Sequence, residues 1–204
     1  MTIETKPKGR WERRKEQTRD TIISTALELF GKQGIESTSM EQIAEESDIA
    51  KATLYKYFPN KEAIAAAYMQ EAVREKMAEM DRLITENADT RSRLLALLTM
   101  ISEWNEENRD IVKLHASARF QDLLSGHIDN NRLSGFEYAL TRIFKVGQDN
   151  GELRQDLSAQ KLALYYKAMY LVPFGGWLLD QGSSDLESSL AESVDLFLGG
   201  ARQH

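Results

Sequence analysis

The chain has 204 residues, 42% of them hydrophobic, which fits one or two soluble domains with a sizeable core. It contains no cysteine, which excludes disulfides, thiolate metal sites and cysteine nucleophiles. No apolar run approaches the roughly 18 residues of a membrane span. Residues 1–10 are polar and lack the apolar stretch of a secretory signal, so we expect a cytoplasmic protein.

The net charge of -6 is unevenly distributed along the chain. Residues 1–61 carry 11 Lys and Arg against 10 Asp and Glu, whereas the remainder has a net charge of -7. The basic excess is greatest between Lys6 and Arg19, as expected where one end of a protein meets a polyanion. We therefore expect residues 1–15 to form a basic flexible arm. Such an arm either enters the minor groove of DNA or is a solvated tail.

Apolar residues recur at helical spacing through nearly the whole chain, and no strand-like alternation of useful length interrupts them. Gly34 ends the first helix, and residues 39–42, Ser-Met-Glu-Gln, form a capping box that starts a short second one. Pro59 ends the third helix and Asn60 caps a long fourth one. The first four expected helices cover residues 22–34, 39–47, 50–58 and 60–86.

Five further helices are expected after residue 87. Their apolar positions fall within residues 94–101, 111–123, 136–146, 162–179 and 186–197, separated by polar or glycine-containing segments. The predicted fold class is therefore all-α.

Residues 39–58 have the pattern of a helix-turn-helix, in which the second helix enters the major groove of DNA. Ile43 and Ala44 give the first helix an inner face, and Asp48 tolerates the left-handed conformation that the turn needs. Leu54 and Phe58 give the second helix its inner face. The side chains left facing outward are Lys51, Ala52, Thr53, Tyr55 and Lys56. Cations, methyl groups and hydroxyls of this kind suit contacts with base edges and phosphates.

This region resembles the tetracycline-repressor (TetR) family. The matching residues are 39–44, Ser-Met-Glu-Gln-Ile-Ala, and 53–62, Thr-Leu-Tyr-Lys-Tyr-Phe-Pro-Asn-Lys-Glu. The resemblance implies a three-helix DNA-binding domain at residues 16–76, whereas the rest of the chain matches only in length and helical content. It also implies base contacts from Lys51, Ala52 and Thr53 and phosphate contacts from Ser39, Tyr55, Tyr57 and Lys61, with Lys56 in either class.

Two positions depart from the family pattern. Asp48 stands where the family usually has glycine, and Ala50 stands where it has serine or threonine. Alanine cannot cap a helix, which typically loses about 1 kcal/mol. Among the aromatic residues, Phe58 and Tyr57 also fit a purely structural place in the core, whereas the outward phase of Tyr55 argues against burial.

The resemblance further implies that residues 77–204 bind a small-molecule effector and dimerise through their last two helices. Apolar stripes on those helices are the candidate interface: Leu162, Tyr166, Met169, Pro173, Leu186, Leu190, Val194 and Phe197. The same stripes also fit the core of a single protomer. A homodimer is favoured because one short recognition helix contacts few bases, so that a palindrome is usually read twice.

The candidate pocket residues are mostly aromatic: Met100, Trp104, His115, Phe120, Tyr138, Tyr165, Tyr170, Phe174 and Trp177. The alternative is that these side chains fill the core, and His115 on an apolar helix face fits a core histidine. The sequence Pro173-Phe174-Gly175-Gly176 predicts a kink that opens space beside its helix.

No HExxH, G-x-S-x-G or phosphate-loop motif is present, and His115, His127 and His204 are scattered, so we expect no enzyme, metal or cofactor. We expect a ligand-responsive repressor that acts as a homodimer on a palindromic operator. Its partners would be double-stranded DNA, a second copy of the chain and a small-molecule effector. The alternative is a helical adaptor that binds protein only.

Overall fold

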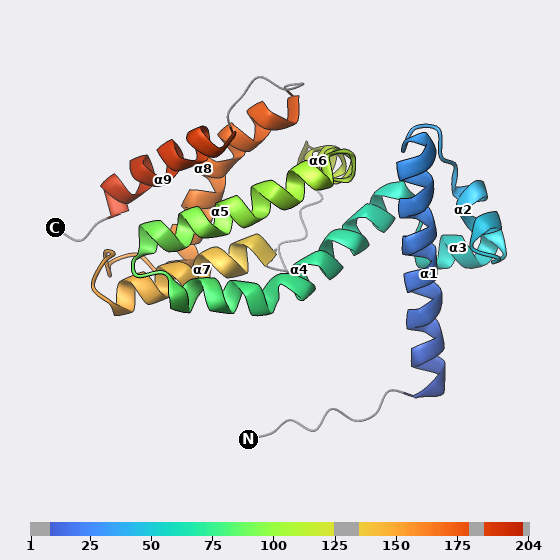
Figure 1. Ribbon diagram of the computed structural model, residues 1–204, viewed down its shortest axis with the longest axis horizontal. Helices are drawn as coiled ribbons and strands as arrows, with labels where there is room; N and C mark the ends of the chain where they lie inside the picture. Colours follow the sequence, from blue (N-terminus) through green and yellow to red (C-terminus); the bar gives the residue numbers. More distant parts are fainter. Residues whose placement is uncertain (1–8, 125–134, 180–185, 202–204) are drawn as a thin grey trace. The chain divides into compact units, whose positions relative to one another are not determined.

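The computed structural model describes residues 9–124, 135–179 and 186–201, and its elements in these ranges are α-helices (Figure 1). The helices are α1 (Arg10–Gln33), α2 (Met40–Glu46), α3 (Lys51–Tyr57), α4 (Lys61–Glu86), α5 (Thr90–Glu107), α6 (Arg109–Leu124), α7 (Gly135–Asp149), α8 (Ala159–Leu179) and α9 (Leu186–Ala201). The predicted all-α class is confirmed. The chain divides into two compact units, Met1–Met69 and Gln70–His204, and α4 contributes residues to both.

Helix α1 begins earlier than the sequence pattern indicates. The backbone N–H of Gly9 donates to the Glu12 carboxylate at 3.0 Å, which satisfies a free donor at the helix start. The ammonium of Lys15 lies 5.6 Å from the centre of the Trp11 ring, one turn away on the same helix. Residues 10–15, expected in a flexible arm, therefore belong to α1.

One apolar core holds the first unit together. Each of its helices contributes fully buried side chains: Ile22 of α1, Ile43 of α2, Leu54 of α3 and Ile64 of α4 have no exposed surface. Figure 1 shows α2 and α3 beside α1, and α2 contacts both of its neighbours. Gly34 closes α1 with a φ of 84°, a conformation that glycine adopts without strain.

The core of the second unit is built from α4, α5, α6, α7, α8 and α9, with Val112 as the contribution of α6. Helix α8 packs against α7 and α9, and α5 packs against both α7 and α9. In this core, the ring centres of Phe144, Tyr166 and Phe197 lie 5.2–6.1 Å apart. Their tilted and edge-on arrangements are the ones that aromatic pairs prefer. Burial raises the pKa of the Tyr166 hydroxyl to about 12, although Ser193 forms a hydrogen bond with it.

A buried arginine ties three segments of the second unit together. Arg93 of α5 is only 5% exposed, and its guanidinium donates to the carbonyl of Ile84 at 3.1 Å and to the carbonyl of Ala88 at 3.1 Å. It also contacts the Glu152 carboxylate at 3.3 Å. That carboxylate accepts a hydrogen bond from the backbone N–H of Thr90 at 2.5 Å. The end of α4, the start of α5 and the segment after α7 thus share one polar network.

Replacing Arg93 with alanine should destabilise the second unit strongly. The change leaves two carbonyls and a partly buried carboxylate without their partner, a loss of about 3–5 kcal/mol. Urea unfolding followed by the fluorescence of Trp104 and Trp177, both in this unit, measures the free energy of unfolding.

Arg91→Ala is the matched control, because Arg91 lies on the same helix but pairs with Asp195 at the surface, at 2.6 Å. Its loss should change the free energy of unfolding far less. Equal losses for the two variants would contradict the assigned role of Arg93.

Candidate functional sites

The turn between α2 and α3 places the second helix against the first. Asp48 has a φ of 52°, the left-handed conformation expected from the sequence, and the Ile49 N–H donates to the Ala44 carbonyl at 3.1 Å. The capping box of α2 is confirmed: Ser39 Oγ accepts from the Gln42 N–H at 3.1 Å, and the Gln42 side chain accepts from the Ser39 N–H at 2.9 Å.

Helix α3 presents one face to the core and the other to solvent. Leu54 is fully buried and Phe58, just past the helix end, is 5% exposed, so Phe58 is a core residue. The predicted DNA-contacting side chains lie on the other face: Lys51, Ala52, Tyr55 and Lys56 are exposed, whereas Thr53 and Tyr57 are half-buried. Ala50 precedes the helix with no side-chain cap, as expected.

Tyr55 is held at the surface by an acidic neighbour. Its ring is 46% exposed, and its hydroxyl donates to the Glu41 carboxylate of α2 at 3.3 Å. Partial burial and the charge of Glu41 raise the pKa of the Tyr55 hydroxyl, so it stays a hydrogen-bond donor at neutral pH.

Lys61 has a structural role that sequence reasoning missed. Its ammonium donates to the carbonyl of Ile35 at 2.6 Å and to the carbonyl of Thr38 at 2.9 Å. These bonds tie the start of α4 to the loop before α2. An ammonium has three donors, so one N–H remains for the phosphate contact that the family resemblance implies.

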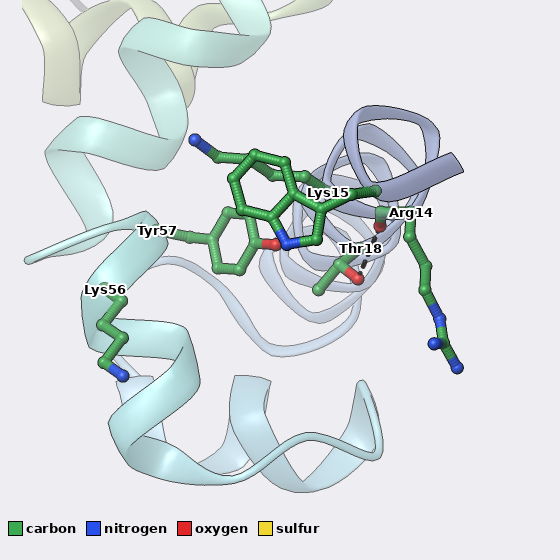
Figure 2. Close-up of a pocket in the computed structure, with 6 residues that line it drawn as sticks. Arg14, Lys15, Thr18, Lys56 and Tyr57 are labelled. Carbon is green, nitrogen blue, oxygen red and sulfur yellow. Dashed lines mark hydrogen bonds between the residues drawn. The ribbon is translucent and has the colours of Figure 1, made fainter. Parts of the chain in front are cut away.

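A surface groove of about 500 Å³ lies beside α3 and was not expected from the sequence. It is lined by Trp11, Arg14, Lys15, Thr18, Lys56 and Tyr57. Figure 2 shows Arg14 of α1 and Lys56 of α3 on either side of Thr18 and Tyr57. In the sequence, the cations clustered around Trp11 were the one sign of this groove. They lie beside α3 only because α1 starts as early as Arg10.

The predicted interface stripe packs within the protomer. Leu162, Tyr166, Leu186, Leu190 and Val194 are buried in the core of the second unit, and Met169, Pro173 and Phe197 are half-buried. The five buried side chains therefore belong to the core of the protomer, whereas Met169, Pro173 and Phe197 keep part of their surface, and an interface at this stripe stays a prediction. The exposed apolar residues of α8 are instead Leu164, Tyr165, Leu171, Val172 and Leu179.

The predicted pocket residues separate into two groups. Tyr170 and Trp177 are buried, and Met100, Trp104, His115 and Phe174 are half-buried. Tyr138 and Tyr165 are 40% and 49% exposed, because each lies on the outer side of its helix, and they do not line the interior. The side chain of Phe120 lies outside the described residues.

Buried and half-buried aromatic side chains form a continuous row that runs along α8 and ends at Phe136 of α7. Ring centres are 4.7 Å apart for Phe136 and Tyr170, 5.4 Å for Tyr170 and Phe174, and 5.7 Å for Phe174 and Trp177. The guanidinium of Arg109 lies 4.6 Å from the centre of the Trp177 ring. Burial raises the pKa of the Tyr170 hydroxyl, against the opposing effect of its hydrogen bond with Asn105.

A candidate membrane-spanning helix is not found among the described residues. The same part of the chain holds no group of three or more His, Cys, Asp or Glu residues able to bind a metal ion.

Comparison with known families identifies the helix-turn-helix. Residues 22–68 match the model of the bacterial regulatory proteins of the tetR family. The DNA-binding part of the chain is of the TetR type. The chain is a DNA-binding transcriptional regulator, and the family gives the adaptor alternative no support.

Relatives of this regulator differ in how much of the chain they match. HTH-type transcriptional regulator YuxN of Bacillus subtilis is 32% identical over 46% of this chain, and the match spans 32% of YuxN. HTH-type transcriptional regulator YfiR of the same species is 24% identical over 90% of this chain and 91% of its own length.

The whole fold is that of a solved TetR-family repressor. Thermus thermophilus FadR, crystallised with lauroyl-CoA, superposes with a TM-score of 0.74 over 91% of this chain and 97% of that one. The two sequences are 23% identical, so this likeness shows the fold.

Substitutions at the N-cap positions of α2 and α3 should change the stability of the two helices in opposite directions. Ala50→Ser adds a hydroxyl at a position whose φ of -64° and ψ of 138° suit a cap, and should stabilise α3 by about 1 kcal/mol. Ser39→Ala removes the existing cap of α2 and should destabilise that helix by about the same amount. Hydrogen exchange of the α2 and α3 amides measures both changes. Slower exchange in both variants, or in neither, would contradict the capping assignments.

Proposed function

We propose that this regulator is a ligand-responsive repressor that binds a palindromic operator as a homodimer. The observation that carries the proposal is helix α3, whose inner face is buried while Lys51, Ala52, Tyr55 and Lys56 remain exposed. An effector bound in the second unit would lower the affinity for DNA, and DNA would lower the affinity for the effector by the same factor.

Base readout is assigned to the start of α3. In a helix-turn-helix, residues near the N-terminus of the recognition helix reach the base edges. Lys51 and Ala52 occupy this end and are exposed, and Thr53 is half-buried beside them. Lys can donate to guanine acceptors, and the methyl groups of Ala and Thr suit the thymine methyl. Phosphate contacts are assigned to Ser39, Tyr55, Lys56, Tyr57 and the remaining N–H of Lys61.

Replacing Lys51 and replacing Lys56 should have different effects on the affinity for operator and for random DNA. Lys51→Ala should weaken operator binding by about 1–3 kcal/mol and relax the preference at one position of each half-site. Lys56→Ala should weaken operator and random DNA alike and reduce the log–log salt slope by nearly one unit per protomer. Competition binding against operator variants and random duplexes measures both effects. Equal loss on operator and random DNA for Lys51→Ala would contradict its role in base readout.

The dimer interface is assigned to the outer face of α8. Leu164, Leu171, Val172 and Leu179 are 54–87% exposed, and Tyr165 lies among them. Leu171 and Val172 follow Leu164 by seven and eight positions, and Leu179 follows Val172 by seven, spacings of about two helical turns. They therefore form one apolar strip along the helix. Leu196 of the neighbouring α9 is 73% exposed. In a two-fold symmetric interface, the strip on α8 of one protomer would be covered by the same strip of a second protomer.

Val172→Asp should therefore produce a folded monomer. Val172 is 78% exposed in the single chain, so the change disturbs no core packing, yet it places a charge in the proposed interface. Sedimentation measures the mass and circular dichroism the helix content. Thr99→Asp on the exposed side of α5 is the matched control and should leave the dimer intact. A folded Val172→Asp protein that still sediments as a dimer would contradict this interface.

We expect the effector to be a largely apolar molecule. The aromatic row of Phe136, Tyr170, Phe174 and Trp177 gives α8 an apolar inner side with a few polar tips, the usual form of a small-molecule site. The FadR relative was crystallised with lauroyl-CoA, a ligand with a long apolar chain. Helix α4 carries residues of both units, and a shift of this helix would transmit effector binding to the DNA-binding unit.

A further inference from the structure

The groove between the start of α1 and the end of α3 is strongly cationic. Arg14, Lys15 and Lys56 all line it, and no carboxylate in the described part of the chain lies within ion-pair distance of any of the three. Elsewhere on α1 the cations do pair, as Lys32 does with Glu28 at 3.6 Å. Three cations that form no ion pair with any described carboxylate match a polyanion.

An exposed indole stands at one side of this groove. Trp11 is 74% exposed, more than any other aromatic residue in the described chain, and Lys15 lies over its ring. The indole N–H is a hydrogen-bond donor only, and Tyr57 adds a hydroxyl beside it, whereas the Thr18 hydroxyl already donates to the Arg14 carbonyl at 3.0 Å. A phosphodiester backbone offers anionic oxygens next to apolar sugar faces. It therefore suits this combination of cations, hydrogen-bond donors and aromatic surface.

The groove is continuous with the surface that contacts DNA. Lys56 follows Lys51 by five residues, which is about 7.5 Å along α3. Because the N-terminal end of a recognition helix reaches the bases, the C-terminal end and the adjoining start of α1 lie toward the DNA strand that borders the groove. Figure 2 shows the head groups of Arg14 and Lys56 pointing toward the same edge of the view, whereas Lys15 extends the other way.

From these observations we propose that the Trp11–Arg14–Lys15 end of α1 is a second DNA-contact site, which binds the sugar–phosphate backbone flanking each half-site. The proposal rests on the proposed function, since it extends the surface of the same DNA complex. It adds affinity and footprint length without reading sequence.

The test compares operator duplexes of two lengths at several salt concentrations. The operator is first selected from random duplexes with the wild-type full-length chain. It is then prepared as the minimal site and with about five base pairs added to each flank. The wild-type protein should bind the longer duplex more tightly. In Arg14→Gln/Lys15→Gln, this advantage should disappear while binding to the minimal site stays unchanged.

The salt slope gives the number of lost contacts. On the longer duplex, the double variant should lose about 0.9 units of log–log slope per contact, or nearly two per protomer. When the salt concentration rises from about 50 to about 200 mM, the affinity of both proteins for the longer duplex falls. The fall should be about 12-fold smaller for the double variant than for the wild type, counted per protomer. Lys32→Gln, on the same helix but about 25 Å farther along it, is the matched control and should behave as the wild type.

Trp11 gives an independent readout. In the wild-type protein, DNA should protect part of the tryptophan fluorescence from acrylamide, and Trp11→Phe should abolish that protection. Circular dichroism checks that each variant is folded, which we expect because all three side chains are exposed.

Three outcomes would overturn the proposal. An unchanged salt slope in the double variant, or loss of affinity that is equal on both duplexes, would remove the contact with the flank. Unchanged protection in Trp11→Phe would remove the tryptophan from the site. Failure of the wild-type chain to bind any duplex would instead overturn the proposed function itself, and this inference with it.

Discussion

The burial of Leu54 and Phe58 is the constraint on which the DNA-binding surface depends. Helix α3 has seven residues, too few for an isolated helix to be stable in water. It lacks a side-chain cap at Ala50, so its stability comes from packing against α1 and α2. Once Leu54 is fixed in the core, the helical period alone decides that Lys51, Tyr55 and Lys56 face outward. The geometry of readout is thus a consequence of the core.

Hydrogen bonds from two buried or half-buried cations hold the two ends of α4 in place. Lys61 binds two carbonyls of the loop before α2, which fixes the start of α4 against the DNA-binding helices. At the other end of α4, Arg93 binds the Ile84 and Ala88 carbonyls. Each end of α4 is thus held by a polar network within its own unit.

The sequence predicts the helices well and the faces of the last helices poorly. Capping boxes, glycines and Pro59 mark helix ends by local chemistry, so the expected α4 ends at the observed Glu86. Helix α8, by contrast, is apolar on both sides: Leu162 and Tyr166 are buried, whereas Leu164 and Val172 are exposed. A periodic pattern cannot tell which of two apolar faces meets the core. The groove beside α3 was missed because it combines residues from two helices that only the fold brings together.

Selection of bound sequences from random DNA duplexes with the full-length chain tests the central claim most directly. A homodimer that reads bases through two copies of α3 should enrich one two-fold symmetric sequence, with half-site centres about one helical turn apart or a multiple of it. Enrichment of a single site without symmetry, or of no sequence at all, would contradict the account.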